Sequence, residues 1–435
     1  MSRRADPKAN SPAARCAEGG PVNLTDLRID GRRLLARIDA LAQIGAIDGG
    51  GSCRLALTDD DGRGRDQVAA WMREQGLAVS VDAIGNLFGV RAGSDDLPPV
   101  MTGSHIDTVR TGGRYDGILG VLAGLEVMQA LDDAGIRTRR PLAVGVFTNE
   151  EGARFAPDML GSLVYVGGMP LEQALDARAI DGSRLGDELQ RIGYAGVEPI
   201  GALRPSAFVE LHIEQGPVLD LEGVTIGAVE DLQGISWQEL TITGQSNHAG
   251  TTPMRMRHDA GYAACAVATF VRKMAREMGG GQVATVGNIQ LHPNLINVIA
   301  ARATLTVDLR NTDETLLKRA EAWLAEFLAT LARDEGVGIT SRVLARFEPV
   351  VFDAAVVRRI ETVAGRLGLR HRRMTSGAGH DAQMLARICP AAMIFVPSVK
   401  GISHNPAEHT QPDDLCAGAN VLLQTLVELA NDKEM

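Results

Sequence analysis

The chain has 435 residues, of which 45% are hydrophobic, and it carries a formal net charge of −10 at pH 7. This length favours two domains over a single core, and the composition is typical of a soluble globular protein. An acidic chain has no basic excess to neutralise phosphates, so the charge argues against nucleic-acid binding and against an anionic membrane surface.

Five cysteines stand at positions 16, 53, 265, 389 and 416, and none forms a Cys-x-x-Cys pair. This odd, scattered count favours a reducing cytoplasm over a disulfide framework. Residues 1–22 are polar and rich in Ala, Pro and Arg, so we expect a disordered tail without the apolar core of a secretory signal. No stretch approaches the ~20 apolar residues of a membrane span.

The first half of the chain alternates helical and strand-like segments. Apolar residues recur at helical spacing in 27–44, 64–75 and 117–131, and short apolar runs occupy 99–103, 142–148 and 207–213. Strands that alternate with helices predict a mixed α/β sheet covered on both faces. Such sheets bind ligands at the loops beyond their strand ends.

The pattern changes near residue 222. Strands are predicted at 235–243, 283–290, 300–309 and 339–346, and helices at 259–278 and 313–333. This βαββαβ order is typical of a split βαβ sandwich. A helix at 356–367, a strand at 392–396 and a helix from 413 then resume the first pattern. We therefore predict an inserted α+β domain at 222–347, between two parts of one α/β domain at 23–221 and 348–435.

Five motifs rich in His, Asp and Glu stand at the edges of the apolar runs. They are Gly103-Ser104-His105-Ile106-Asp107, Arg114-Tyr115-Asp116-Gly117, Asn149-Glu150-Glu151-Gly152, Glu210-Leu211-His212-Ile213-Glu214 and Ser403-His404-Asn405. Imidazoles together with carboxylates suit a hydrolase that holds two divalent ions. The extra carboxylate beside Glu151 is informative, because a hydrolase needs a base in addition to its ligands.

Each motif also has an ordinary interpretation. Asp116 could cap a helix, the Glu150–Glu151 pair could be a solvated loop, and residues 210–214 could form the polar side of a surface strand. Asp107 could orient the ring of His105 or face solvent. The segment Gly377-Ala378-Gly379-His380-Asp381-Ala382 matches a dinucleotide-binding pattern, which we reject because no convincing apolar strand precedes it.

Taken together, the motifs resemble the hydantoinase/carbamoylase family of di-metal amidohydrolases. This family includes N-carbamoyl-L-amino acid hydrolases, β-ureidopropionases and allantoate amidohydrolases. The similarity runs from about Leu27 to the C-terminus. It adds two further motifs to the five above, Asn247-His248-Ala249-Gly250-Thr251-Thr252-Pro253-Met254 and Ser376-Gly377-Ala378-Gly379-His380-Asp381-Ala382. Seven motifs in one order make the resemblance specific.

The resemblance implies a carboxypeptidase-like catalytic domain with an inserted lid that also forms a homodimer. It implies two divalent ions per subunit, one held by His105, Asp116 and His212 and the other by Asp116, Glu151 and His404. Glu150 would be the general base and Asp107 the partner of His105. Substrate would be held by Gln215, His248, Asn297, Arg310, Gly379 and His380, with His248 reaching the active site of the other subunit.

The chain departs from the family at one turn. Ala300-Ala301 follows Asn297-Val298-Ile299, where the family often has Pro-Gly. We place this turn beside Asn297 and Arg310, near the tail of the substrate. The ligand set is intact, and zinc suits its histidines, while manganese, cobalt or nickel also suits its carboxylates.

The function expected is that of a cytoplasmic, metal-dependent amidohydrolase of small ureido carboxylates. It would cleave the ureido group of N-carbamoyl-L-amino acids to give amino acid, ammonia and carbon dioxide. Glu150 would move the proton from water to the leaving amine, and His248 would stabilise the oxyanion. The alternatives are an allantoate amidohydrolase or β-ureidopropionase, a peptidase or N-acyl-amino-acid deacylase, and a non-catalytic metal-binding protein. The last of these has no reason to keep Glu150 free beside Glu151.

Overall fold

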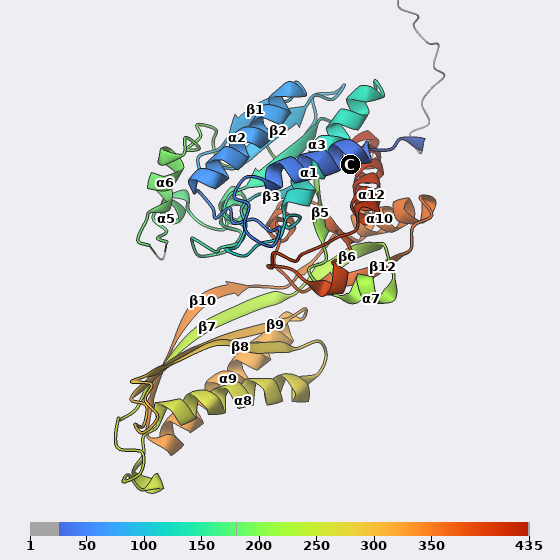
Figure 1. Ribbon diagram of the computed structural model, residues 1–435. Helices are drawn as coiled ribbons and strands as arrows, with labels where there is room; N and C mark the ends of the chain where they lie inside the picture. Colours follow the sequence, from blue (N-terminus) through green and yellow to red (C-terminus); the bar gives the residue numbers. More distant parts are fainter. Residues whose placement is uncertain (1–25, 180, 434–435) are drawn as a thin grey trace, which may run out of the picture.

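The structure is a computed structural model that describes residues 26–179 and 181–433; the tail predicted at 1–22 lies outside the described residues. Its strands form one sheet of nine strands and one of four. Figure 1 shows them as two bodies, with the large sheet in the upper one. The predicted α/β class with a second, α+β unit is confirmed. None of the described helices is long and apolar enough to cross a bilayer.

The large sheet consists of β1 (Ala78–Val81), β2 (Leu87–Arg91), β3 (Val100–His105), β4 (Leu142–Phe147), β5 (Ala207–Ile213), β6 (Ile226–Leu232), β11 (Val350–Val351), β12 (His371–Ser376) and β13 (Ala391–Val396). Their order is β1-β2-β4-β3-β5-β13-β6-β11, with β12 paired to β6. The four central strands β4, β3, β5 and β13 are parallel and completely buried. Their carboxyl ends therefore meet at one edge of the sheet.

Helices cover both faces of this sheet. Because side chains alternate along a strand, Leu211 packs against Gly418 of α12 (Pro412–Asn431), whereas Glu210 accepts a hydrogen bond from the N–H of Ala382 in α11 (Asp381–Leu385). Three helices pack against α12 on the same face of the sheet: α1 (Gly31–Ala42), α3 (Ile118–Asp133) and α10 (Ala354–Arg366). The remaining helices of this body are α2 (Asp59–Glu74), α4 (Leu160–Tyr165), α5 (Leu171–Leu175), α6 (Leu185–Arg191), α7 (Val218–Glu222) and α11 (Asp381–Leu385).

The local sequence explains where several helices begin. The side chain of Thr58 accepts a hydrogen bond from the N–H of Asp61, so α2 starts earlier than the 64 predicted from its apolar residues. Helix α3 starts after Gly117, whose φ is 67°. A side chain at this glycine would collide with the ring of His105. Only glycine therefore lets the start of α3 approach that ring.

The second sheet has the order β10-β7-β9-β8 and is antiparallel throughout. Alternate residues of β9 are buried and pack with the helices, which leaves Asp308 and Arg310 on the opposite face. The elements of this unit are β7 (Gly234–Thr243), α8 (Ala260–Met278), β8 (Val283–His292), β9 (Arg302–Asn311), α9 (Glu314–Glu335) and β10 (Gly338–Phe347). The βαββαβ order follows the predicted one.

Two expectations from the sequence need correction. Strand β6, which the predicted boundary at 222 assigned to the insertion, pairs with β12 and β13 of the large sheet, so the second sheet begins at Gly234. The loop at 377–380 does follow a strand, because β12 ends at Ser376. Strand β12 was missed because it is half-exposed, lies toward one end of the sheet, and carries mostly polar residues in place of an apolar run.

Candidate metal centre and substrate cavity

The predicted ligands gather at the carboxyl ends of the central strands. His105 is the last residue of β3 and lies level with Phe147, the last residue of β4. His212 is the penultimate residue of β5 and lies level with Phe395 of β13. Glu150 and Glu151 follow β4 directly, so neighbouring parallel strands deliver all four side chains to the same edge.

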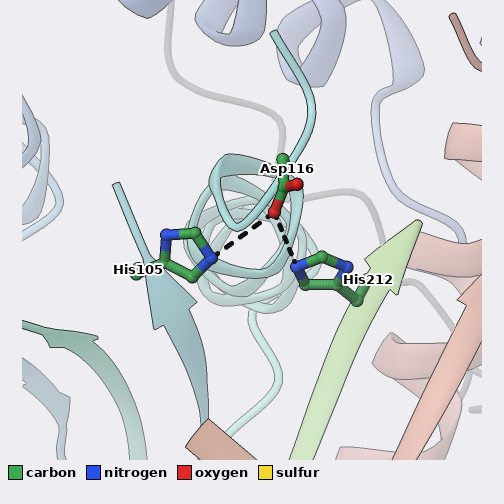
Figure 2. Close-up of side chains that lie close together, drawn as sticks. All are labelled: His105, Asp116 and His212. Carbon is green, nitrogen blue, oxygen red and sulfur yellow. Dashed lines mark ion pairs between the residues drawn. The ribbon is translucent and has the colours of Figure 1, made fainter. Parts of the chain in front are cut away.

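Asp116 lies at the centre of the cluster. Its Oδ1 is 3.5 Å from His105 Nε2 and 3.3 Å from His212 Nε2, and Figure 2 shows both rings directed at this oxygen. Its Oδ2 is 3.4 Å from His404 Nε2, which is also 3.2 Å from Glu151 Oε2. One carboxylate thus faces histidines on both sides.

Backbone contacts determine how two of these rings are oriented. His105 Nδ1 lies 2.9 Å from the carbonyl oxygen of Asp107, and His212 Nδ1 lies 2.9 Å from that of Ile213. A carbonyl oxygen can only accept, so in each neutral ring Nδ1 carries the proton and Nε2 keeps its lone pair for a ligand bond. Gly117 N–H donates to His212 Nε2 at 3.1 Å, which agrees with an unprotonated Nε2; an ion would take the place of this contact.

We expected the carboxylate of Asp107 to pair with His105, but the structure shows a different contact. The closest approach of that carboxylate to His105 Nδ1 is 3.8 Å, and the backbone carbonyl of Asp107 makes the shorter contact. The carboxylate oxygens instead accept hydrogen bonds from the N–H groups of Glu150 at 3.2 Å and Glu151 at 3.3 Å. Asp107 therefore orients one histidine and the loop that carries both glutamates.

Glu150 stands beside the candidate ligands, and no side chain or backbone N–H in the described ranges donates a hydrogen bond to its carboxylate except through the His105 contact. Its Oε2 is 3.3 Å from His105 Nε2, and the side chain is buried. Burial raises the pKa of Glu150 well above its usual value, the charges of Asp381 and Glu151 add to this, and His105 opposes it. A carboxyl group with a raised pKa in a cleft suits proton transfer.

The donor set fits divalent cations. Two groups of ligand atoms, one from His105, Asp116 and His212 and the other from Asp116, Glu151 and His404, each lie within 4.8 Å of one another. Burial lowers the pKa of His105, but Glu150 and other carboxylates outweigh it and raise the pKa well above its usual value. The carboxylates thus favour a positive charge at the imidazoles, and a bound metal ion would supply such a charge.

Two other carboxylates of the predicted motifs have structural partners. Glu210, which with His212 and His380 forms a third possible group of ligands, accepts hydrogen bonds from Ser104 Oγ at 2.6 Å and Ala382 N–H at 2.7 Å. Glu214 accepts from the N–H groups at the start of α7. Each oxygen of both carboxylates accepts a hydrogen bond from the protein, so these residues help to shape the site.

A cavity of about 360 Å³ opens onto the cluster. Of the predicted substrate residues, Gln215, Arg310, Gly379 and His380 line it. Gln215 has a positive φ of 59° and donates from Nε2 to Asp116 Oδ2 at 2.8 Å. The ring of His380 lies 4.5 Å from that of His212, and its Nε2 is 3.1 Å from Ser376 Oγ.

Arg310 extends into this cavity from the second sheet. Its Nε and Nη2 face the carboxylate of Asp308 at 3.1 and 3.0 Å, and its Nη1 donates to the carbonyl oxygen of Gly377 at 2.8 Å. The guanidinium carbon is 5.8 Å from the ring centre of Trp237. Arg310 thus links the second sheet to the loop after β12, in the cavity that the candidate ligands also line.

His248 and Asn297 do not line the cavity of the same chain. Both are exposed, and they share the loops at the other end of the second sheet, where Ala249 N–H donates to the carbonyl oxygen of Asn297 at 3.0 Å. Asn297 precedes β9 and Arg310 is near its end, so a strand of roughly 30 Å separates them. The expectation that Asn297 adjoins Arg310 is therefore wrong within one chain.

Three residues of the site were missed by the sequence reading. Glu408 is buried and accepts from the N–H groups of Tyr115 at 3.0 Å and Asp116 at 3.3 Å, so it holds the backbone of the central aspartate. Its position four residues after His404 was the only available signal. Asp158 and Trp237 line the cavity, and nothing in their sequence neighbourhoods distinguishes them.

This chain matches the profile of one protein family and is similar to several known hydrolases and amidases. The profile of peptidase family M20/M25/M40 matches residues 101–428. The N-carbamoyl-L-amino-acid amidohydrolase of Rhizobium meliloti is 42% identical over 93% of this chain and 97% of its own length. The ureidoglycolate hydrolase of Arabidopsis thaliana is 35% identical over 95% and 90%. The structure of a hydantoinase/carbamoylase family amidase from Burkholderia vietnamiensis has a TM-score of 0.88 at 47% identity, covering 94% of this chain and 99% of that one.

Proposed function

Because the chain belongs to the hydantoinase/carbamoylase amidases within peptidase family M20/M25/M40, we propose that it hydrolyses the ureido group of N-carbamoyl-L-amino acids. Such a hydrolase acts on a carbon–nitrogen bond other than a peptide bond and releases amino acid, ammonia and carbon dioxide. The proposed active form is a cytoplasmic homodimer with two divalent ions per subunit, of which zinc best suits the histidines and manganese, cobalt or nickel is also compatible.

The observation that carries the proposal is the placement of Glu150. Asp116 is common to both groups of ligand atoms, and Glu150 lies 3.3 Å from His105 without belonging to either group. Ions held by these groups would polarise the ureido carbonyl and lower the pKa of water in the cavity. Glu150 then takes a proton from the attacking water and delivers it to the leaving nitrogen.

Arg310 is the proposed anchor for the substrate carboxylate. Asp308 occupies the side edge of the guanidinium, formed by Nε and Nη2, and Gly377 takes one N–H of Nη1. Among the described residues, one N–H on each of Nη1 and Nη2 is left without a partner, and we propose that these two form the end edge of the guanidinium. This pair matches a carboxylate bidentately, and the two protein contacts hold the fork in position.

Arg310→Lys is expected to weaken recognition of the carboxylate. A single ammonium cannot hold Asp308, Gly377 and the substrate with the geometry of the fork, and loss of a desolvated charge pair costs on the order of 2–5 kcal/mol. The specificity constant for N-carbamoyl amino acids should fall more than about tenfold, and less for analogues with an amide in place of the carboxylate. Measuring kcat/KM for both substrates in both proteins tests this. An unchanged preference for acid over amide assigns the carboxylate contact elsewhere.

His248 is proposed to act in the active site of the partner subunit. Its Nδ1 accepts from the N–H groups of Gly250 at 3.0 Å and Thr251 at 3.2 Å. The neutral ring therefore carries its proton on Nε2, in an exposed side chain that is suited to donate to an oxyanion. Because His248 lies far from the cavity of its own chain, a second copy is the natural recipient, with the second sheet unit as the dimer contact.

Mixing two inactive variants tests this arrangement. A heterodimer of one Glu150→Gln subunit and one His248→Ala subunit has one site with both residues intact. Equal mixing should recover about a quarter of wild-type activity, since half of the dimers are mixed and each has one working site of two. A mixture of Glu150→Gln with the double variant is the matched control and should stay inactive. If native mass spectrometry detects heterodimers but no activity returns, His248 does not act across subunits.

A ureidoglycolate-type substrate is the second candidate, because a ureidoglycolate hydrolase is 35% identical over most of this chain. One panel separates the possibilities: ammonia release from N-carbamoyl-L-amino acids, N-carbamoyl-β-alanine, allantoate, ureidoglycolate and dipeptides. The proposal expects the highest kcat/KM with an N-carbamoyl-L-amino acid. If activity is highest with ureidoglycolate or allantoate, that compound is the substrate instead of an N-carbamoyl-L-amino acid. If only dipeptides are cleaved, the enzyme is a peptidase.

A further inference from the structure

Asp158 is a cavity carboxylate that the proposed reaction does not use. It lies in the segment between Glu151 and α4, which folds back on the catalytic loop: Asn149 Nδ2 donates to the carbonyl oxygens of Phe155 at 2.8 Å and Pro157 at 3.2 Å. Met159 N–H also donates to the carbonyl oxygen of Glu150 at 2.7 Å. The backbone around Asp158 is thus tied to the residues that carry the chemistry.

The carboxylate of Asp158 has one oxygen buried at the wall of the cavity. Apart from its own N–H, no residue in the described ranges donates a hydrogen bond to this carboxylate, and its Oδ1 is buried without a partner. A buried polar atom left unpaired costs roughly 1–3 kcal/mol, so a purely structural role does not explain the residue. Burial raises its pKa to about 6.

The nearby charges do not neutralise Asp158 either. Arg310, Glu151 and Asp308 are the charged groups that act on it. Arg310 is already shared between Asp308 and, in the proposed function, the substrate carboxylate. Glu151 and Asp308 repel a further negative charge. A molecule that enters the cavity can supply the missing donor.

We propose that Asp158 accepts a hydrogen bond from an N–H group on the substrate's side chain, so that the enzyme prefers ureido acids with such a donor. This inference rests on the proposed function and narrows its substrate class. An apolar side chain would leave the carboxylate unpaired, and an acidic one would be repelled. The expected order is therefore donor-bearing, then apolar, then acidic side chains.

Three substrates of similar size test this order: the N-carbamoyl derivatives of L-glutamine, L-methionine and L-glutamate. At pH 8, where the carboxylate is ionised, wild-type kcat/KM should favour glutamine over glutamate by at least about tenfold, with methionine between them. Asp158→Asn keeps the shape but removes the charge, and its amide can both donate and accept. In this variant the glutamine-to-glutamate ratio should fall to within about threefold. Asp158→Ser provides a second, smaller replacement with the same expected direction.

Exposed Asp96, replaced by Asn, is the matched control and should keep the wild-type order. Dissociation constants of the same substrates for the Glu150→Gln enzyme, measured by calorimetry, should follow the same order without turnover. An unchanged ratio in Asp158→Asn, or an equal loss for all three substrates, overturns the role of Asp158 and leaves the proposed function standing. A wild-type enzyme that hydrolyses no ureido acid overturns the proposed function and this inference with it.

Discussion

Replacement of Glu150 by Gln is expected to lower kcat by about 10²–10⁴-fold, the usual cost of removing a general base. The amide has the shape of the carboxylate but cannot take a proton from water. The N–H of residue 150 still donates to Asp107, and the ligands around Asp116 are untouched, so fold and metal content should persist. Steady-state kinetics together with elemental analysis of the purified variant measure both quantities.

The neighbouring variant Glu151→Gln provides the contrast. Glu151 belongs to a group of ligand atoms and Glu150 does not, so Glu151→Gln should lose metal as well as turnover. Since Glu150 must be ionised to act as a base, wild-type kcat should fall as the pH is lowered, and this acidic limb should be absent from the residual activity of Glu150→Gln. Near-normal turnover in Glu150→Gln would assign proton transfer to another group.

Chelation of the metal is expected to abolish activity, and added zinc, manganese, cobalt or nickel should restore it. Removal should also lower the melting temperature, because a ligand that binds only the folded state stabilises it by about 4 kcal/mol at a thousandfold excess over its dissociation constant. Without an ion, only the neighbouring imidazoles remain to compensate the buried carboxylates of Asp116 and Glu150. Full activity in a preparation that elemental analysis shows to be metal-free would contradict the metal-dependent reaction.

Metal binding should also release protons. Hydrogen bonds with Asp116 and Glu151 raise the pKa of His404 to about 10 in the absence of an ion. His404 must lose this proton before Nε2 can bind a cation, so the apparent affinity should decrease as the pH falls. Calorimetric titration in two buffers with different ionisation enthalpies measures the number of protons released. A binding heat that is independent of the buffer would indicate that His404 is not a ligand.

Strong local patterns made much of the fold predictable. Strand β5 has the predicted bounds, and β4 and α8 differ from theirs by one residue, because their apolar runs and spacing are nearly continuous. Strands β1, β2, β6, β11 and β12 were not predicted. They lie toward the two ends of the sheet, where partial exposure weakens the apolar pattern from which a strand is predicted.

The residue types at the candidate centre were also predictable, because metal ligands need particular donor atoms and stand where strands end. The contact made by each atom was not. Asp107 reaches His105 through its backbone carbonyl, and Glu408 reaches the backbone of Asp116 from a distant part of the chain. Such hydrogen bonds depend on loop conformations that tertiary packing decides.

By itself, the sequence determined the α/β class, the βαββαβ order of the second unit and the set of residues able to hold cations, since each depends on local spacing or on side-chain chemistry. Only the tertiary structure decided which distant residues share a cavity. It brought Arg310 to Gly377, left His248 and Asn297 at the far end of their sheet, and left Asp158 Oδ1 without a partner in the part of the chain that the structure describes. The physical reason is that chain folding sets long-range distances, whereas periodicity reports only on neighbours along the chain.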